Sequence, residues 1–409
     1  MTPKRIMLVA GEASGDMLAA ELVEAMRAEA GATNRPTPSF FGAGGPLMSL
    51  SGVKLAVDLT EHAVVGIWEV VRHYRKFRRL FHQLLNLARD HKPDVVILVD
   101  YPGFNLRLAK ALKEAARRST APWNPRIVYY VSPQLWAWHE SRVHQIARDV
   151  DLLLSIFPFE KDWYARRASQ LQVEFVGHPI LDRYSRGRGA TEFFRQTAGN
   201  LRLPPAPLIL LLPGSRVREL KKHLPPMLDA AVRIQKGRHV QFRMVVPGES
   251  LADLARKFLA DGAPSIDLLV GGLPDILPKA QLAIASSGTV TLECAFFGVP
   301  SVILYRTSWS TYHLGRRFIK VPYLAMPNVL ANEAIYPEFI QDAATGDNLA
   351  RESLDLLNNA QRRDSVRTRL ARVIQSLGEP GASSRAAAAV WKLLHPDSIS
   401  SSKHPPPGH

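Results

Sequence analysis

Polar and glycine-rich segments follow the predicted strands of this 409-residue chain, where side chains can reach a ligand. The first follows the apolar run Ile6–Ala10 and contains Gly11, Glu12, Ser14, Gly15 and Asp16. Its glycines allow a tight turn, and the N–H groups that begin the next helix can bind an anion or a sugar hydroxyl. Ser14 and Asp16 are equally suited to capping a helix. The glycine spacing is not that of a dinucleotide-binding turn.

Asp100 follows a second apolar run, residues 94–99, and begins the segment Asp100-Tyr101-Pro102-Gly103-Phe104-Asn105. A carboxylate at the end of a strand can accept a proton from a hydroxyl nucleophile. Asp, Pro and Gly are also common turn residues. The local pattern therefore fits a catalytic base and a simple turn about equally well.

Two tryptophans, Trp136 and Trp138, lie in the segment 132–139, after the strand predicted at 126–131. Indole faces stack on sugar rings and acyl chains, so together with Gln134 they make this segment a candidate acceptor-binding loop. Two buried aromatic anchors at the start of a helix explain the tryptophans at least as well.

Two turns in the second half of the chain have the character of a phosphate site. Their residues are Gly214, Ser215 and Arg216 in the first turn, and Ser287, Gly288, Thr289 and Glu293 in the second. Small residues bring backbone N–H groups close to a phosphate, an arginine binds it through two hydrogen bonds, and a glutamate one helical turn further on can accept ribose hydroxyls. A helix cap with a buried or solvated glutamate is the alternative, but the two turns together favour a nucleotide.

A basic amphipathic segment covers residues 63–88, where apolar side chains recur at helical spacing. Its candidate membrane-surface residues are Trp68, Arg72, Arg75, Lys76, Phe77, Arg78 and Arg79. Basic amphipathic helices with aromatic residues are typical of anionic lipid surfaces. A core helix with a solvated basic face fits the same pattern. Both descriptions can hold at once, with the apolar face in the core and the basic face on lipid.

Short β-branched runs alternate with helical patterns in two successive halves, which predicts two doubly wound α/β domains of Rossmann type. Strands are expected near 6–10, 39–43, 94–99, 126–131, 151–156 and 173–176, and then near 208–212, 240–246, 266–269, 282–285 and 301–304. The expected organisation is a first domain over 1–185, a linker over 186–207, a second domain over 208–347, C-terminal helices over 348–395 and a disordered tail over 396–409. Ligands bind at the carboxyl ends of the strands in such sheets, which is where the motifs lie.

The chain is strongly basic, with 52 Lys and Arg against 37 Asp and Glu and a formal net charge of +15. This charge indicates an anionic partner, such as a membrane surface, phosphorylated ligands or nucleic acid. A single cysteine, Cys294, excludes an internal disulfide and fits a reducing compartment. No apolar run has the length of a signal peptide core or a membrane span, so we expect a cytoplasmic protein with peripheral membrane association.

The motifs, taken in order, resemble the lipid-A-disaccharide synthase family from residue 5 to about 395. They are Gly11-Glu12-x-Ser14-Gly15-Asp16, Phe41-Gly42-x-Gly44-Gly45, Asp100-x-Pro102-x-Phe104-Asn105, Ser132-Pro133-Gln134-x-Trp136-Ala137-Trp138, Gly177-His178-Pro179, Leu212-Pro213-Gly214-Ser215-Arg216, Ser287-Gly288-Thr289-x-x-Leu292-Glu293, Pro322-Tyr323 and Pro327-Asn328. Each motif alone is weak, whereas their order and spacing are specific. One departure is Gly103, where members of this family often have a second Asp.

The resemblance implies a GT-B fold, in which two Rossmann-like domains face each other across a cleft and a C-terminal helix packs back on the first domain. It implies inverting transfer of 2,3-diacylglucosamine from UDP-2,3-diacylglucosamine to the 6-hydroxyl of 2,3-diacylglucosamine-1-phosphate, in lipid A biosynthesis of Gram-negative bacteria. Asp100 is then the base, and Asn328 joins the donor-site residues. The acceptor side of the cleft is expected to be lined by Gly11, Glu12, Ser14, Gly15, Asp16, Gln134 and Trp136. No metal or other cofactor is implied. The implied partners are the two lipid substrates, the cytoplasmic face of the inner membrane and a second copy of the chain.

Three other functions are compatible with parts of the pattern. A UDP-sugar epimerase of the same fold predicts similar phosphate turns but does not need the basic amphipathic segment. A non-catalytic protein of the membrane surface predicts that Asp100 is dispensable. A nucleic-acid binder predicts tight binding with a steep salt dependence, but no nucleic-acid-binding motif is recognised, and phosphorylated substrates at an anionic membrane already account for the charge.

Overall fold

The computed structural model describes residues 2–59, 74–119, 123–185, 206–259, 265–308 and 321–395. The chain divides into two compact units: unit 1 comprises residues 1–182 and 380–409, and unit 2 comprises residues 183–379. The chain thus returns to its first unit near its C-terminus. Residues 186–205 of the predicted linker and the predicted tail, 396–409, lie outside the described residues.

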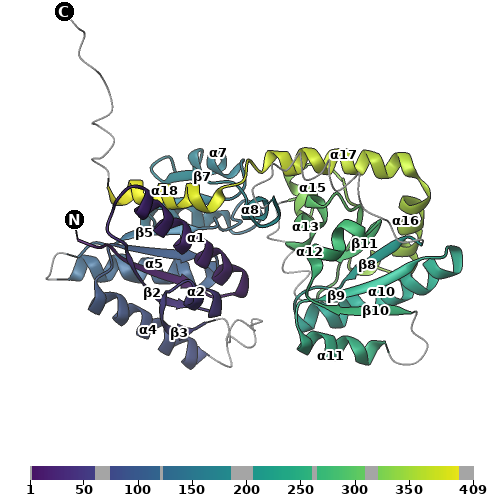
Figure 1. The fold of residues 1–409 in the computed structure, drawn as a ribbon, viewed down its shortest axis with the longest axis horizontal. Helices are drawn as coiled ribbons and strands as arrows, with labels where there is room; N and C mark the ends of the chain where they lie inside the picture. The colour runs from purple at the N-terminus through teal and green to yellow at the C-terminus, as the bar shows by residue number, and fades with distance from the viewer. Residues whose placement is uncertain are drawn as a thin grey trace, which may run out of the picture. The chain divides into compact units, whose positions relative to one another are not determined.

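Unit 1 is built on a parallel sheet (Figure 1). Its strand order is β3-β2-β1-β4-β5-β6-β7. Its strands are β1 (Arg5–Ala10), β2 (Ser39–Gly44), β3 (Lys54–Asp58), β4 (Val95–Val99), β5 (Arg126–Tyr130), β6 (Leu152–Ser155) and β7 (Gln172–Phe175). The sequence predicted all of them except β3, an edge strand with no fully buried residue. The strand order reverses between β1 and β4, which is typical of doubly wound sheets.

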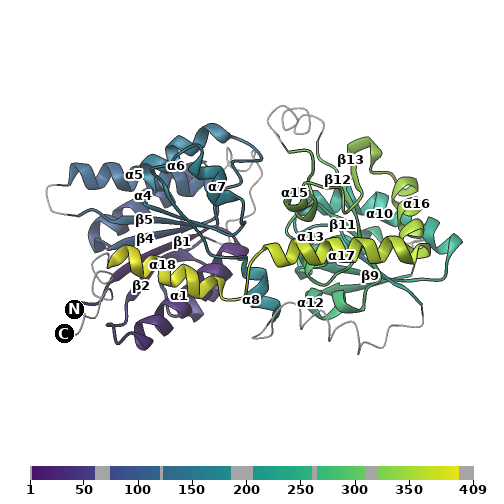
Figure 2. The same cartoon turned by 90° about the horizontal axis from the view of Figure 1, so that it is seen from above.

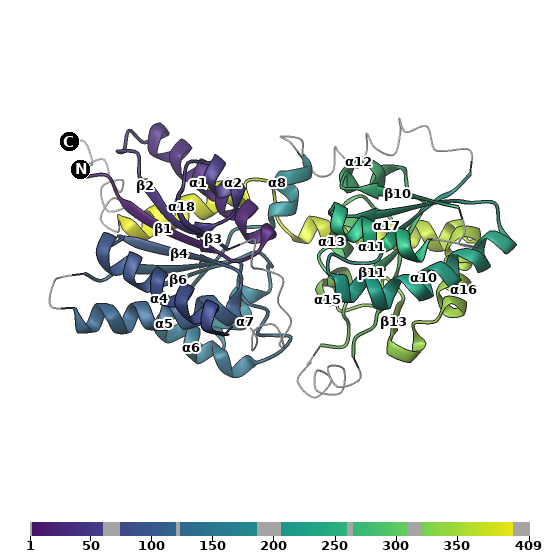
Figure 3. The ribbon, with the colours of Figure 1, turned by 90° about the horizontal axis from the view of Figure 1, so that it is seen from below.

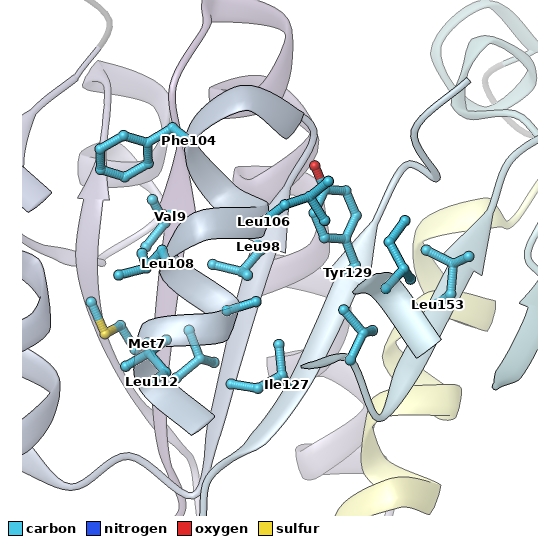
Figure 4. Packing of buried hydrophobic residues seen from close by; sticks show 14 of the residues in the cluster. Met7, Val9, Leu98, Phe104, Leu106, Leu108, Leu112, Ile127, Tyr129 and Leu153 are labelled. Carbon is cyan, nitrogen blue, oxygen red and sulfur yellow. The ribbon is translucent and has the colours of Figure 1, made fainter. Parts of the chain in front are cut away.

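Helices cover both faces of this sheet (Figure 3). They are α1 (Ala13–Ala32), α2 (Pro46–Leu50), α4 (Tyr74–His91), α5 (Pro102–Arg118), α6 (Val143–Asp149), α7 (Glu160–Ala165) and α18 (Ala382–Leu394), with α8 (Pro179–Ser185) at the passage to unit 2. Alternate strand residues face each side. Figure 4 shows Met7, Val9, Leu98 and Ile127 pointing toward α5, where they form one buried cluster.

The C-terminal helix α18 packs against α1 in unit 1 (Figure 1), as the sequence predicted. Trp391 is buried, and its indole Nε1 donates to the carbonyl of Met26 at 3.2 Å. The carboxylate of Asp182 accepts hydrogen bonds from the backbone N–H groups of Gly381 and Ser383, so it caps the start of α18. The helical segment expected over 348–395 is divided, because its first two helices belong to unit 2.

Unit 2 is built on a second parallel sheet (Figure 2), with the strand order β10-β9-β8-β11-β12-β13, one strand fewer than in unit 1. Its strands are β8 (Leu208–Leu212), β9 (Gln241–Val246), β10 (Ile266–Val270), β11 (Leu282–Ser286), β12 (Ser301–Tyr305) and β13 (Glu338–Ile340). Its helices are α10 (Val217–Gly237), α11 (Glu249–Phe258), α12 (Leu273–Ile276), α13 (Val290–Phe296), α15 (Met326–Ala331), α16 (Gly346–Asn358) and α17 (Ala360–Ser376). The three-residue edge strand β13 was not predicted. Both units therefore confirm the predicted doubly wound α/β class.

Candidate active site

Four of the predicted motifs lie at the carboxyl ends of the central strand pair in each unit. In unit 1, β1 leads into Gly11 and its neighbour β4 leads into Asp100. In unit 2, β8 leads into Pro213 and its neighbour β11 leads into Ser287. These are the points at which the strand order reverses, and ligands of doubly wound sheets bind there.

The turn that carries Asp100 is strained and held by hydrogen bonds. Asp100 and Tyr101 have φ angles of 47° and 51°, a left-handed conformation that costs about 1–2 kcal/mol for each non-glycine residue. The carbonyl oxygen of Asp100 accepts hydrogen bonds from Asn105 Nδ2 at 2.8 Å and from the Tyr129 hydroxyl at 2.6 Å. Burial raises the pKa of Tyr129 well above its usual value, so this hydroxyl remains a donor. Backbone strain of this kind is concentrated at functional sites.

Gly11 and Tyr101 bring the two turns of unit 1 together. A Cβ atom on Gly11 would overlap the Tyr101 ring, so only glycine allows this contact. Burial, with a smaller contribution from the charge of nearby Glu12, raises the pKa of Tyr101. A Cβ atom on Gly15 would be in ordinary van der Waals contact with Val99 of β4, and Ser14 is exposed at the start of α1.

Asp16 has a different role from the one that the sequence suggested. Its buried carboxylate accepts backbone hydrogen bonds from Gly45 at 2.8 Å and from Leu47 and Met48 at 3.0 Å. It therefore caps α2 rather than its own helix, and its oxygens are directed at the protein. This corrects the assignment of Asp16 to the acceptor-binding residues.

The loop 132–139 is anchored by a buried acid that sequence reasoning missed, Glu160. Its carboxylate accepts hydrogen bonds from the Ser132 hydroxyl, from Trp136 Nε1 at 2.9 Å and from the backbone N–H of Phe157 at 3.3 Å. Burial raises the pKa of Glu160 to about 7. No local spacing signals this residue, because it lies 24 positions from Trp136.

The two tryptophans of this loop have opposite environments. Trp136 is only 8% exposed and packs edge-on against Phe157 and Phe159, so it is an anchor. Trp138 is 48% exposed, and Gln134 is also exposed. Of the two rings that the sequence offered for acceptor binding, Trp138 is thus the one accessible to a ligand, and Trp136 is not.

The first turn of unit 2 presents an exposed arginine beside a glutamate. Gly214 has a φ of 118°, in the region that favours glycine, and the following Ser215 donates its backbone N–H to Glu219 Oε2 at 3.0 Å. Arg216 is the N-cap residue of α10, and its side chain is 69% exposed, with Nη1 at 3.7 Å from Glu219 Oε1. The turn therefore holds backbone donors and a cation together.

A buried histidine, His223, supports this turn through contacts with two backbone groups. His223 Nδ1 lies 2.9 Å from the carbonyl oxygen of Pro213, and His223 Nε2 accepts the backbone N–H of Arg306 at 3.0 Å. A neutral ring with its proton on Nδ1 satisfies both contacts. Burial lowers the pKa of His223, which favours that neutral form.

The second turn of unit 2 leads into α13. Ser287 donates its hydroxyl to the carbonyl oxygen of Leu324 at 3.0 Å, whereas Gly288 and Thr289 are exposed. Glu293 is hydrogen-bonded to the Tyr184 hydroxyl, and burial raises the pKa of its carboxyl group. The exposed part of this turn is consequently Gly288–Thr289, and the half-buried Glu293 follows one helical turn later in α13.

Asn328 is fully occupied by protein contacts. Its Nδ2 donates to the Tyr336 carbonyl and to Glu338 Oε1, both at 2.8 Å, and its Oδ1 accepts from the backbone N–H groups of Ile335 and Tyr336 at 3.0 and 2.8 Å. An Asn side chain makes four hydrogen bonds, so none remains for a ligand. This changes the expected role of Asn328 from a ligand contact to a positioning residue. It holds Glu338, which accepts the N–H groups of Leu324 and Ala325.

The basic helix α4 shows both faces that the sequence predicted. Arg75, Arg78 and Arg79 are exposed, whereas Phe77 packs against the core cluster of unit 1. Phe77 therefore belongs to the core face and not to the basic surface. Trp68, Arg72 and the side chain of Lys76 lie outside the described residues.

The described residues contain neither a candidate metal cluster nor a candidate membrane-spanning helix. No three His, Cys, Asp or Glu side chains within these ranges gather closely enough to hold a metal ion. Among the described helices, none combines the length and the apolar character needed to cross a membrane.

Comparison with known proteins identifies the family. A family model described as lipid-A-disaccharide synthetase matches residues 6–392. The lipid-A-disaccharide synthase of Geobacter metallireducens is 38% identical over 397 residues, which cover 96% of this chain and 97% of that protein. This chain belongs to the lipid-A-disaccharide synthase family. The synthase of Myxococcus xanthus is also 38% identical, over 97% of this chain and 99% of its own length. The enzyme is accordingly a glycosyltransferase.

Solved structures show the same fold at low sequence identity. A putative UDP-N-acetylglucosamine 2-epimerase from Listeria monocytogenes has a TM-score of 0.65 at 15% identity and covers 97% of this chain and 98% of its own. The calicheamicin glycosyltransferase CalG4 has a TM-score of 0.57 at 14% identity and covers 97% and 100%. These likenesses confirm the GT-B fold class alone. Because family membership rests on the synthases, the epimerase alternative is set aside.

Proposed function

We propose that this enzyme transfers 2,3-diacylglucosamine from UDP-2,3-diacylglucosamine to the 6-hydroxyl of 2,3-diacylglucosamine-1-phosphate. The products are a β(1→6)-linked disaccharide phosphate and UDP. One observation carries the proposal: in a member of the synthase family, a carboxylate turn lies at the strand-order reversal of one sheet, and two small-residue turns with an arginine lie at that of the other. A transfer between two bound substrates needs these two kinds of group, a proton acceptor and an anion site.

Asp100 is the proposed general base. The acceptor hydroxyl oxygen attacks the anomeric carbon of the donor, the bond from that carbon to the UDP oxygen breaks, and the hydroxyl proton passes to the Asp100 carboxylate. A single displacement inverts the anomeric configuration, from α in the donor to β in the product. The hydrogen bonds from Asn105 and Tyr129 support this role, since they hold the backbone from which the carboxylate projects. Glu12 and Trp138 are the proposed neighbours on the acceptor side.

The donor is proposed to bind at the two turns of unit 2. Arg216 and the backbone N–H groups near Ser215, Gly288 and Thr289 would stabilise the negative charge that develops on UDP as it leaves. Glu293 would accept the ribose hydroxyls. With these groups as the source of stabilisation, transfer is expected to need no metal.

The membrane surface and a second copy of the chain are the remaining proposed partners. Both substrates carry acyl chains, so the enzyme has to meet them at a bilayer, proposed to be the cytoplasmic face of the inner membrane. The exposed Arg75, Arg78 and Arg79 and the net charge of +15 favour contact with anionic lipid. A homodimer is proposed from the resemblance to the family.

The test is a transfer assay with both lipid substrates in detergent and EDTA. Wild-type enzyme is expected to form the disaccharide, and Asp100→Asn is expected to lower kcat by about 10²–10⁴, the usual contribution of a general base. Asp94→Asn is the matched control, because Asp94 directly precedes β4, at the end of the strand opposite Asp100, and pairs with Lys4 at 3.1 Å. It should retain activity.

Three results would contradict parts of the proposal. Unchanged turnover in a folded Asp100→Asn variant would remove Asp100 as the base. Loss of wild-type activity in EDTA, with recovery on adding Mg²⁺, would refute metal independence. Conversion of the UDP-sugar without any disaccharide would refute the transfer reaction itself.

A further inference from the structure

Glu219 folds over the turn that begins unit 2. It is the third residue of α10, and its Oε2 reaches back past the N-cap residue Arg216 to accept the backbone N–H of Ser215 at 3.0 Å. A Cβ atom on Gly214 would overlap this carboxylate, so the glycine leaves the space into which the side chain folds. Arg216 Nη1 lies 3.7 Å from the other carboxylate oxygen.

These contacts are the ones proposed above for a phosphate of the donor. The Ser215 N–H has one hydrogen to donate, and it is directed at Glu219. A phosphate at the same place would be about 4 Å or less from a second anion, and such like-charge contacts are unfavourable even when they are partly solvated. Glu219 and a diphosphate therefore exclude each other from this position.

We propose that Glu219 is an internal anion that occupies the diphosphate subsite of the ligand-free enzyme and is displaced when a nucleoside diphosphate binds. This inference rests on the proposed donor site. The carboxylate holds the turn in its binding conformation while the site is empty, and it weakens retention of UDP after transfer. An ordinary helix-capping glutamate would instead affect only stability.

Calorimetric titration of the purified full-length enzyme with UDP tests this role. Glu219→Gln keeps the size of the side chain but removes its charge, so UDP is expected to bind about tenfold more tightly, which corresponds to about 1.4 kcal/mol. Glu249→Gln is the matched control: it makes the same charge change in the first turn of α11, where Glu249 is 70% exposed and paired with Arg256. Its UDP affinity should equal that of wild type.

A second variant separates the reach of Glu219 from its charge. Glu219→Asp keeps the charge but is one methylene too short to hold the Ser215 N–H, so its UDP affinity should lie between those of wild type and Glu219→Gln. Unchanged or weaker UDP binding by a folded Glu219→Gln variant overturns the inference while leaving the donor site intact. If wild type does not bind UDP, or if Arg216→Ala binds it equally well, the proposed donor site fails and the inference fails with it.

Discussion

Glu160 makes the stability of unit 1 depend on pH in a predictable direction. Burial raises its pKa from 4.5 in the unfolded chain to about 7 in the folded protein. The folded state therefore binds the proton more tightly, and protonation of Glu160 stabilises it by about 3 kcal/mol. This contribution is fully present below pH 4.5 and is lost as the pH rises through 7. Above pH 7 the buried charge remains, supported by its hydrogen bonds from Ser132, Trp136 and Phe157.

Replacing Glu160 with Gln removes this titration. The amide can still accept the Trp136 N–H, but its NH₂ group faces the N–H of Phe157, so one buried donor loses its acceptor at a cost of about 1–3 kcal/mol. That cost is independent of pH. The free energy of unfolding of wild type, relative to Glu160→Gln, should accordingly fall by about 2 to 3 kcal/mol between pH 5 and pH 8.

Urea unfolding followed by tryptophan fluorescence measures this difference at each pH. All of the seven tryptophans except Trp309 fall within the sequence of unit 1, so the signal reports mainly on that unit. Glu140→Gln is the matched control, because Glu140 is partly exposed and paired with Arg167, and its difference from wild type should stay within about 0.5 kcal/mol across the range. Parallel curves for wild type and Glu160→Gln would refute the reasoning, since they would mean that Glu160 does not titrate differently on folding.

Four further changes have defined outcomes. Tyr129→Phe removes one of the two donors to the strained turn, so steady-state kinetics should show kcat lower by about tenfold with little change in KM. Asn328→Ala leaves two buried N–H groups without their acceptor, so denaturant unfolding should show a loss of about 2–5 kcal/mol and UDP titration a weaker affinity. Trp391→Ala empties the contact between α18 and α1, at a cost of about 3–5 kcal/mol in thermal unfolding. Replacing both Arg78 and Arg79 with Gln should weaken binding to anionic vesicles by about 1 kcal/mol per residue in a sedimentation assay, while binding to neutral vesicles stays unchanged.

Apart from the edge strands β7 and β10, the strands that could be predicted are those buried on both faces. Central parallel strands such as β4 and β8 are continuous apolar runs, because helices cover both sides of the sheet. The edge strands β3 and β13 are only half-buried and lack such a run. They pair with a strand already in place, and that pairing is a tertiary interaction that leaves no local pattern.

The site shows the same division between position and role. The turns at Asp100, Gly214 and Ser287 could be located because each follows a predicted strand. The roles of Asp16 and Trp136 could not be inferred, because their partners lie 24 to 32 residues away in the chain. A buried polar side chain is defined by the donors and acceptors around it, and the fold determines which those are.

Two acids, the buried Glu160 and the half-buried Glu338, are not expected to touch a substrate, but they position loops that are. In unit 1, Glu160 fixes the loop that exposes Trp138. In unit 2, Glu338 accepts the N–H groups of Leu324 and Ala325, and Leu324 in turn accepts the hydroxyl of Ser287 beside the exposed turn. Each carboxylate accepts hydrogen bonds from donors in neighbouring loops. The free-energy cost of removing the carboxylate from water is therefore offset only when those loops are in their folded positions. Loss of either acid should therefore loosen a binding loop before it unfolds the sheet, and substrate affinity should fall further than stability.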